Sequence, residues 1–167
     1  MDEGKILSSD FFRDYLGQEL LGKTVSDSYL IGNSICFVFK DVSIEIHASW
    51  RFLNSKQVTV GSADIGWEET AWSEEEKRVI ELIRRIISGL VYSKLNKLKV
   101  GPFNDVYFRF DDGVEFQNFH SSTSKSGNIT VRDDRDRTKL IVSGNNITRA
   151  KIKTFGAPDG KPKRSKI

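Results

Sequence analysis

The hydrophobic residues between Ser73 and Leu90 recur with the three- and four-residue spacing of a single helical face. The residues that share this face are Val79, Leu82, Ile83, Ile86, Ile87 and Leu90. Ser73 can accept a hydrogen bond from the backbone N–H of Glu76 while the Glu76 side chain reaches back to Ser73, a reciprocal pairing that begins many helices. Gly89 stands where a helix can end. The pattern therefore predicts a central amphipathic helix over about residues 73–90.

A shorter helical pattern follows the N-cap candidates Ser8, Ser9 and Asp10. It predicts a short N-terminal helix of two to three turns. Residues 17–24 then match the phosphate-binding pattern G-x-x-x-x-G-K-[ST] letter for letter. A phosphate loop follows a strand and opens a helix, whereas here a helical pattern comes first and an alternating one comes after. We therefore interpret this segment as a helix end with Gly22 as the turn.

From Val25 onward the hydrophobic spacing changes to two, which predicts a β-meander with a turn at Gly32-Asn33. A further strand pair is predicted in 49–61. After the central helix, residues 104–112 align without gaps on residues 33–41 with four identities, which indicates an internal duplication. Asp112-Gly113 is a hairpin signal, and two more strands are predicted in 128–143.

These elements predict an α+β fold of two pseudo-repeated antiparallel β-meander lobes, about 21–64 and 89–143, with the central helix between or across them. The length of 167 residues and the hydrophobic share of 38% fit one domain over residues 1–150. No apolar run approaches the length of a membrane span and the N-terminus lacks the pattern of a secretory signal, so we expect a cytoplasmic protein. The single cysteine, Cys36, allows no internal disulfide, and we expect a buried thiol.

The net charge of +3 is the sum of a slightly acidic body and a basic C-terminal tail. The tail, 151–167, contains six basic residues and one acidic residue, which leaves 20 basic and 22 acidic groups in residues 1–150. The tail has few apolar groups to bury, so we expect it to be flexible. It also suggests nucleic-acid binding as a third functional hypothesis.

Several short segments resemble small bacterial domains of unknown function, some of which are encoded beside polymorphic or contact-dependent toxins as candidate immunity proteins. The similar segments are Leu21-Gly22-Lys23-Thr24-Val25, Phe37-Val38-Phe39, Ser49-Trp50-Arg51-Phe52, Val60-Gly61-Ser62-Ala63-Asp64 and residues 105–113. The resemblance spans about residues 21–116. It implies a fold type and a role in binding a partner, and it assigns no catalytic residue.

The most distinctive chemistry lies just before the central helix. Between Asp64 and Glu76 the chain has six carboxylates, no basic residue and two of its three tryptophans. The residues that we single out as a partner-binding surface are Asp64, Trp67, Glu68, Glu69 and Trp72. Glu68 and Glu69 precede the helix cap, so capping does not explain them, and exposed Trp is enriched in binding hot spots. The alternative is that the two tryptophans fold back as a lid on the core.

A small-ligand or nucleotide site between the lobes is the second functional hypothesis, with His47, Trp50, Arg51 and His120 as its candidate residues. The chain has only two histidines and lacks CxxC and HExxH patterns, so we predict neither a catalytic residue nor a metal or other cofactor. The leading hypothesis is a non-enzymatic binding protein that neutralises a protein partner, possessing an acidic surface for a basic toxin domain.

Overall fold

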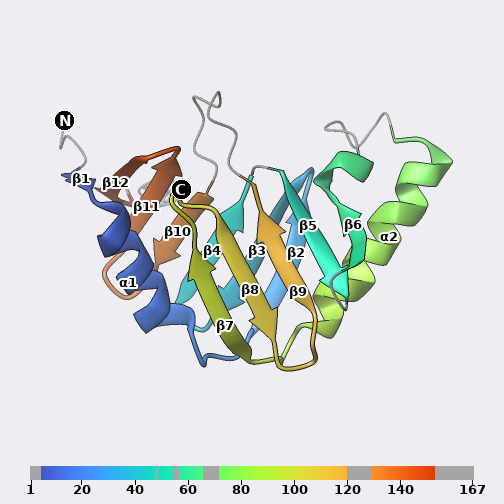
Figure 1. The fold of residues 1–167 in the computed structure, drawn as a ribbon, viewed down its shortest axis with the longest axis horizontal. Helices are drawn as coiled ribbons and strands as arrows, with labels where there is room; N and C mark the ends of the chain where they lie inside the picture. The colour runs from blue at the N-terminus through green and yellow to red at the C-terminus, as the bar shows by residue number, and fades with distance from the viewer. Residues whose placement is uncertain (1–4, 48, 55–56, 66–71, 120–128, 153–167) are drawn as a thin grey trace, which may run out of the picture.

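The computed structural model describes residues 5–47, 49–54, 57–65, 72–119 and 129–152. Most of them belong to two antiparallel β-sheets (Figure 1). The seven-stranded sheet has the order β1-β12-β11-β10-β4-β3-β2, and the five-stranded sheet has the order β6-β5-β9-β8-β7. The chain is thus an α+β protein that consists mainly of strands.

The seven-stranded sheet is built from β1 (Lys5–Leu7), β2 (Asp27–Ile31), β3 (Ser34–Phe39), β4 (Val42–Ile46), β10 (Ile129–Asp133), β11 (Thr138–Ser143) and β12 (Asn146–Lys151). The five-stranded sheet is built from β5 (Trp50–Asn54), β6 (Gln57–Gly61), β7 (Leu95–Val100), β8 (Val106–Phe110) and β9 (Glu115–Asn118). The helices are α1 (Ser9–Leu20), the 3-10 helix η1 (Ser62–Asp64) and α2 (Glu74–Gly89).

The two sheets pack face to face around aromatic side chains. The Phe37 ring of β3 lies with its centroid 6.0 Å from that of Phe108, 5.8 Å from Phe110 and 5.2 Å from Phe116, all on the opposite sheet. Alternate residues of β4 and β8 are buried, as expected for strands with one face on the core. The fold is therefore a β-sandwich with one helix at each side (Figure 1).

The two predicted lobes are not confirmed, because each sheet takes strands from both halves of the chain. Strand β4 of the first half pairs with β10 of the second, and β5 of the first half pairs with β9 of the second. The long helix lies at one side of the sandwich rather than between lobes (Figure 1). There the Ser28 hydroxyl on β2 donates to the carbonyl oxygen of Ile87 on α2 at 2.6 Å.

The prediction of helix α2 and of its start is confirmed. The Ser73 hydroxyl accepts from the Glu76 N–H at 3.2 Å, and the Glu76 carboxylate accepts from the Ser73 N–H at 2.7 Å. The buried face contains Ile80, Ile83 and Ile87. Leu82, which the spacing placed on this face, is 42% exposed, because it lies at the edge of the apolar stripe.

Candidate functional site: the loop end of the sandwich

One end of the sandwich collects the connections β2–β3, β4–β5, β6–α2, β7–β8, β9–β10 and β11–β12, and we call it the loop end. Strand register defines it: Ile46, which ends β4, pairs with Ile35 near the start of β3 and with Ile129 at the start of β10. In the other sheet Trp50, the first residue of β5, pairs with Asn118, the last of β9.

Hydrogen bonds that are buried or partly buried hold the strand ends and turns together at the loop end. The Trp50 indole N–H donates to the carbonyl oxygen of Asn33 at 2.9 Å, and the Asn33 amide donates to the Ser62 carbonyl oxygen at 3.2 Å. The Trp50 backbone N–H donates to the Ser62 hydroxyl at 3.0 Å. On the other side, the Asn104 amide donates to the Gly144 carbonyl oxygen at 2.9 Å. These bonds hold the strand ends and turns of the loop end in fixed positions relative to one another.

Two of the residues predicted from the sequence as a partner-binding surface, Asp64 and Trp72, are described by the structure, and both lie at the loop end. Asp64 is exposed and accepts from the Gly61 N–H at 2.7 Å. Trp72 is half-buried and packs against the core, which fits the lid alternative for this tryptophan. Trp67, Glu68 and Glu69 lie outside the described residues.

The described members of the ligand-residue set predicted from the sequence lie in different places. His47 is on the outer face of the seven-stranded sheet, where its ring hydrogen-bonds with the Ser34 hydroxyl at 3.0 Å. Trp50 is 2% exposed and belongs to the core. Arg51 points to the outer face of the five-stranded sheet, and His120 lies outside the described residues.

Arg51 instead organises a surface that the sequence did not indicate. Its guanidinium donates to the Gln117 side-chain oxygen from Nε at 3.2 Å and from Nη2 at 2.9 Å. The same guanidinium stacks over the Phe119 ring, with its carbon 4.5 Å from the ring centroid. Phe119 is 42% exposed, and its backbone N–H donates to the Ser49 carbonyl oxygen at 2.7 Å.

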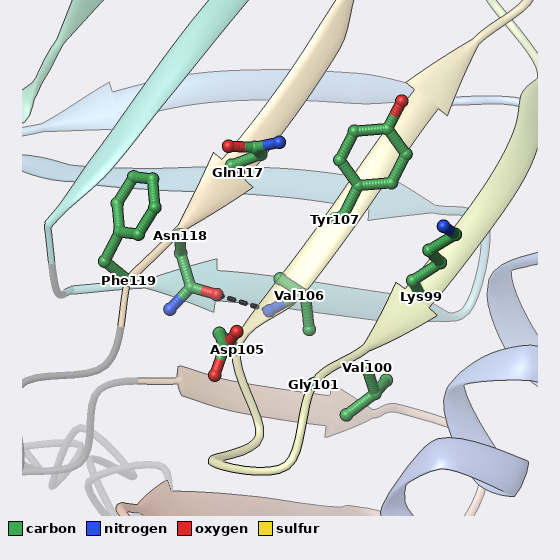
Figure 2. A pocket seen from close by; sticks show the side chains of 9 residues that line it. All are labelled: Lys99, Val100, Gly101, Asp105, Val106, Tyr107, Gln117, Asn118 and Phe119. Carbon is green, nitrogen blue, oxygen red and sulfur yellow. Dashed lines mark hydrogen bonds between the residues drawn. The ribbon is translucent and has the colours of Figure 1, made fainter.

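A cavity of about 330 Å³ opens beside this surface, where β7 and β9 end and β8 begins (Figure 2). Its lining residues are Lys99, Val100, Gly101, Asp105, Val106, Tyr107, Gln117, Asn118 and Phe119. Burial, and then a hydrogen bond with Glu115, raise the pKa of Tyr107. No signal in the sequence marked these residues, because they meet only through the pairing of β8 with β7 and β9.

A second cavity, of about 380 Å³, lies at the opposite end and includes Lys23 and Thr24 of the phosphate-loop-like segment. The backbone N–H of Gly22 donates to Leu95 O at 2.8 Å, and that of Lys23 donates to Leu20 O at 3.0 Å. A phosphate loop needs such N–H groups directed at the ligand. Gly22 has a φ of +75° at the end of α1, so the interpretation as a helix end is confirmed.

Among the described residues no group of three or more His, Cys, Asp and Glu side chains is placed to hold a metal ion. Within the same residues no helix is both long and apolar enough to cross a membrane. Comparison with family models, curated proteins and solved structures finds no match to this chain.

Proposed function

We propose that this chain is a non-enzymatic binding protein that neutralises a protein partner by covering it with the loop end, as an immunity protein would. The observation that carries the proposal is the placement of Arg51, Phe119 and Asp64 close together at the loop end, on or next to the neighbouring strands β9, β5 and β6. Arg51 on β5 pairs with Gly61 on β6, and Gly61 is in turn bonded to Asp64. On its other side Arg51 pairs with Gln117 and stacks on Phe119.

The composition of this surface suits a protein interface. Phe103 in the β7–β8 connection is 60% exposed and Phe119 is 42% exposed, and both lie at the loop end. Aromatic and arginine side chains are enriched in interface hot spots. Because Arg51 holds the Phe119 ring through stacking, binding would cost little side-chain entropy there.

The charge of the adjoining segment indicates a basic partner. Asp64, Glu74 and Glu75 are exposed on the two sides of residues 66–71, which themselves contain Glu68 and Glu69. Carboxylates grouped in this way steer a positively charged partner and raise its association rate. A basic toxin domain fits this description.

The internal duplication remains part of the proposal. The hairpins β3–β4 and β8–β9, which the sequence alignment equates, stand in opposite sheets, and the equated residues Phe37 and Phe108 contact each other across the core. Such a contact is what a pseudo-two-fold arrangement of two copies produces.

The test begins with isolation of the partner from the native cells, followed by measurements on the two purified proteins. The chain should form a stoichiometric complex and abolish the partner's activity. The double variant Glu68→Lys with Glu69→Lys should slow association about tenfold and weaken its salt dependence, with folding unchanged.

The matched control is Asp14→Lys with Asp134→Lys, which makes the same change in charge at exposed positions on α1 and in the β10–β11 turn. This control should leave the association rate near that of the native chain. Equal association rates for the native chain and the Glu68/Glu69 variant would contradict the proposed surface. A complex that leaves the partner fully active would contradict neutralisation.

A further inference from the structure

The outer face of the five-stranded sheet concentrates positive charge. Alternate residues of β8 and β9 are buried on the core side, so the residues between them point outward. Strand register arranges the outward residues in two rows across neighbouring strands. The first row is Lys99, Tyr107, Gln117 and Arg51, and the second is Lys97, Arg109 and Glu115. We call these two rows the basic face.

The basic face has four cations and one carboxylate, and that carboxylate is already engaged. Glu115 has a side chain that is only 14% exposed, and it pairs with Arg109 at 3.8 Å and accepts from the Tyr107 hydroxyl. Lys97 and Lys99 are exposed and form no ion pair within the part of the chain that the structure describes. Residues 1–150 contain more acidic than basic groups, so the positive excess belongs to this face and not to the body as a whole.

The outer face of the seven-stranded sheet is balanced instead, as far as its described strand residues show. There Arg132 and Lys139 stand with Asp27 and Glu45, and Glu45 pairs with Arg132 at 3.7 Å. The two outer faces therefore differ in what they attract. Cations of one sign gathered on one surface attract a negatively charged partner and raise its association rate.

Aromatic rings lie among these cations. Tyr107 stands directly opposite Lys99 on the neighbouring strand, and its bond with Glu115 fixes the position of the ring (Figure 2). Phe119 is 42% exposed at the loop end of the face, although the Arg51 guanidinium covers one side of its ring at 4.5 Å. Because the Gln117 oxygen accepts from Arg51, its amide nitrogen remains as a donor, and Figure 2 shows it on the side of Tyr107.

We propose that the basic face binds single-stranded nucleic acid. The lysine and arginine side chains pair with phosphates, and the Tyr107 and Phe119 rings stack with unpaired bases. Proteins that bind single strands combine a positively charged surface with aromatic side chains in this way. Asp105 borders the face at the loop end, where its carboxylate rests against Gly101, so the phosphates follow Lys97, Lys99 and Arg109 rather than that border.

The dimensions of the face fit a short segment of a strand. From β7 to β5 it crosses three gaps between strands, which is about 14 Å. It therefore holds only a few nucleotides. The inference goes beyond the protein-partner proposal and is tested apart from it, because Lys97, Lys99, Tyr107 and Arg109 have no role in that proposal.

The test is fluorescence anisotropy of the full chain with a labelled oligothymidylate and a labelled oligouridylate of about twelve nucleotides. Binding of either supports the proposal. The logarithm of the association constant should fall against the logarithm of salt concentration with a slope of about −3 or steeper, because each of four phosphate contacts contributes about −0.7.

Competitors separate stacking from charge alone. A duplex hides the faces of its bases, so it should bind at least about tenfold more weakly than the single strand despite its higher charge density. Polyglutamate, which represents an acidic protein, should not displace the strand. Equal or tighter binding of the duplex, displacement by polyglutamate at equal charge, or the absence of single-strand binding would overturn the proposal.

Charge variants locate the site. Lys97→Gln with Lys99→Gln removes two phosphate contacts, so it should weaken binding about 25-fold at about 0.1 M salt and make the slope shallower by about 1.4. The matched control is Lys40→Gln with Lys139→Gln, which removes the same charge from the seven-stranded sheet and should leave affinity and slope near those of the native chain. Unchanged affinity in the Lys97/Lys99 variant would overturn the proposal.

Two further sets of variants test the ring and the basic tail. Tyr107→Thr removes the ring and should weaken binding about fivefold or more with the salt slope unchanged, because stacking releases no counterions. Tyr107→Phe keeps the ring and should bind as the native chain does. Equal losses in these two variants would overturn the proposal, and so would a loss confined to Lys161→Gln with Lys163→Gln, which would assign binding to the tail. Circular dichroism checks the fold of each variant.

Discussion

Asp133, the last residue of β10, is a buried carboxylate, and its substitution should strongly lower the free energy of unfolding. It is 6% exposed. The Arg135 side chain donates to it from Nε at 2.9 Å and from Nη2 at 2.5 Å, and the Tyr15 hydroxyl of α1 donates to it at 3.0 Å. Arg135 also pairs with Glu19 of α1 at 2.8 Å. The carboxylate therefore ties α1 to the seven-stranded sheet.

The hydrogen bonds from Arg135, assisted by Tyr15 and opposed by burial, lower the pKa of Asp133 from 3.8 to about 2. A pKa that is lower in the folded state than in the unfolded state means that folding favours the ionised carboxylate. The resulting stability is fully present above about pH 4 and is lost as the pH falls through 2. A difference of nearly two units corresponds to about 2 kcal/mol.

Asp133→Asn removes this dependence. Its free energy of unfolding, measured by urea denaturation at a series of pH values, should lie below that of the native chain near pH 7. The gap should narrow by about 2 kcal/mol between pH 5 and pH 2, because the native chain alone loses its ionised Asp133 over that range. Asp134→Asn, at an exposed neighbouring position, is the control and should follow the native curve. A gap that stays constant over this pH range would refute the reasoning.

Two further substitutions test the helix start and the loop end. Ser73→Ala removes the acceptor of the Glu76 N–H and should lower the free energy of unfolding by about 1 kcal/mol in urea denaturation, and no change would mean that α2 begins without its cap. Trp50→Phe removes the indole donor and leaves the Asn33 carbonyl oxygen without it, so it should cost about 2 kcal/mol or more in the same assay. A cost below about 0.5 kcal/mol would show that the bond between the sheets contributes little.

The sequence was informative wherever local physics decides the structure. The three- and four-residue spacing and the Ser73–Glu76 pairing located α2 within a residue or two at each end. The alternation of β3 and β4 and the positive φ of Gly113 were likewise readable from the local pattern. In each case the signal lies within a few residues of the feature it specifies.

Three strands escaped prediction for identifiable reasons. Strand β1 has three residues, too few to show a period. In β7 a register shift between Leu95 and Lys97 interrupts the alternation. In β12 the alternation breaks after the buried Ile147. The next residue on the same face is Arg149, which pairs with Asp136 at 2.5 Å, so a charged residue stands where the pattern of a strand requires an apolar one.

The pairing of strands that are far apart in the sequence could not be predicted. The alternation of apolar residues shows which face of a strand is buried, but it does not show which other strand lies beside it. The β4–β10 and β5–β9 ladders mix the two halves and produce sheets rather than lobes. The cavity depends on the same ladders: Asn118 reaches Val106 only because β8 and β9 are neighbours. The candidate site was therefore hidden from the sequence for the same reason as the topology.

The two ends of the sandwich differ in how completely their polar groups are paired. At the end opposite the loop end, Gly22 and Leu95 N–H groups find carbonyl partners at 2.8 and 2.9 Å between the α1–β2 connection and β7. At the loop end, within the described part of the chain, three buried side-chain amide atoms have no hydrogen-bond partner: Asn33 Oδ1, Asn104 Oδ1 and Asn118 Nδ2. Each such atom costs folding free energy, and apolar substitutes would avoid it. These unpaired atoms lie at the same end of the sandwich as Arg51 and Phe119, so the free-energy cost of unpaired polar groups falls at the end that presents the proposed interface.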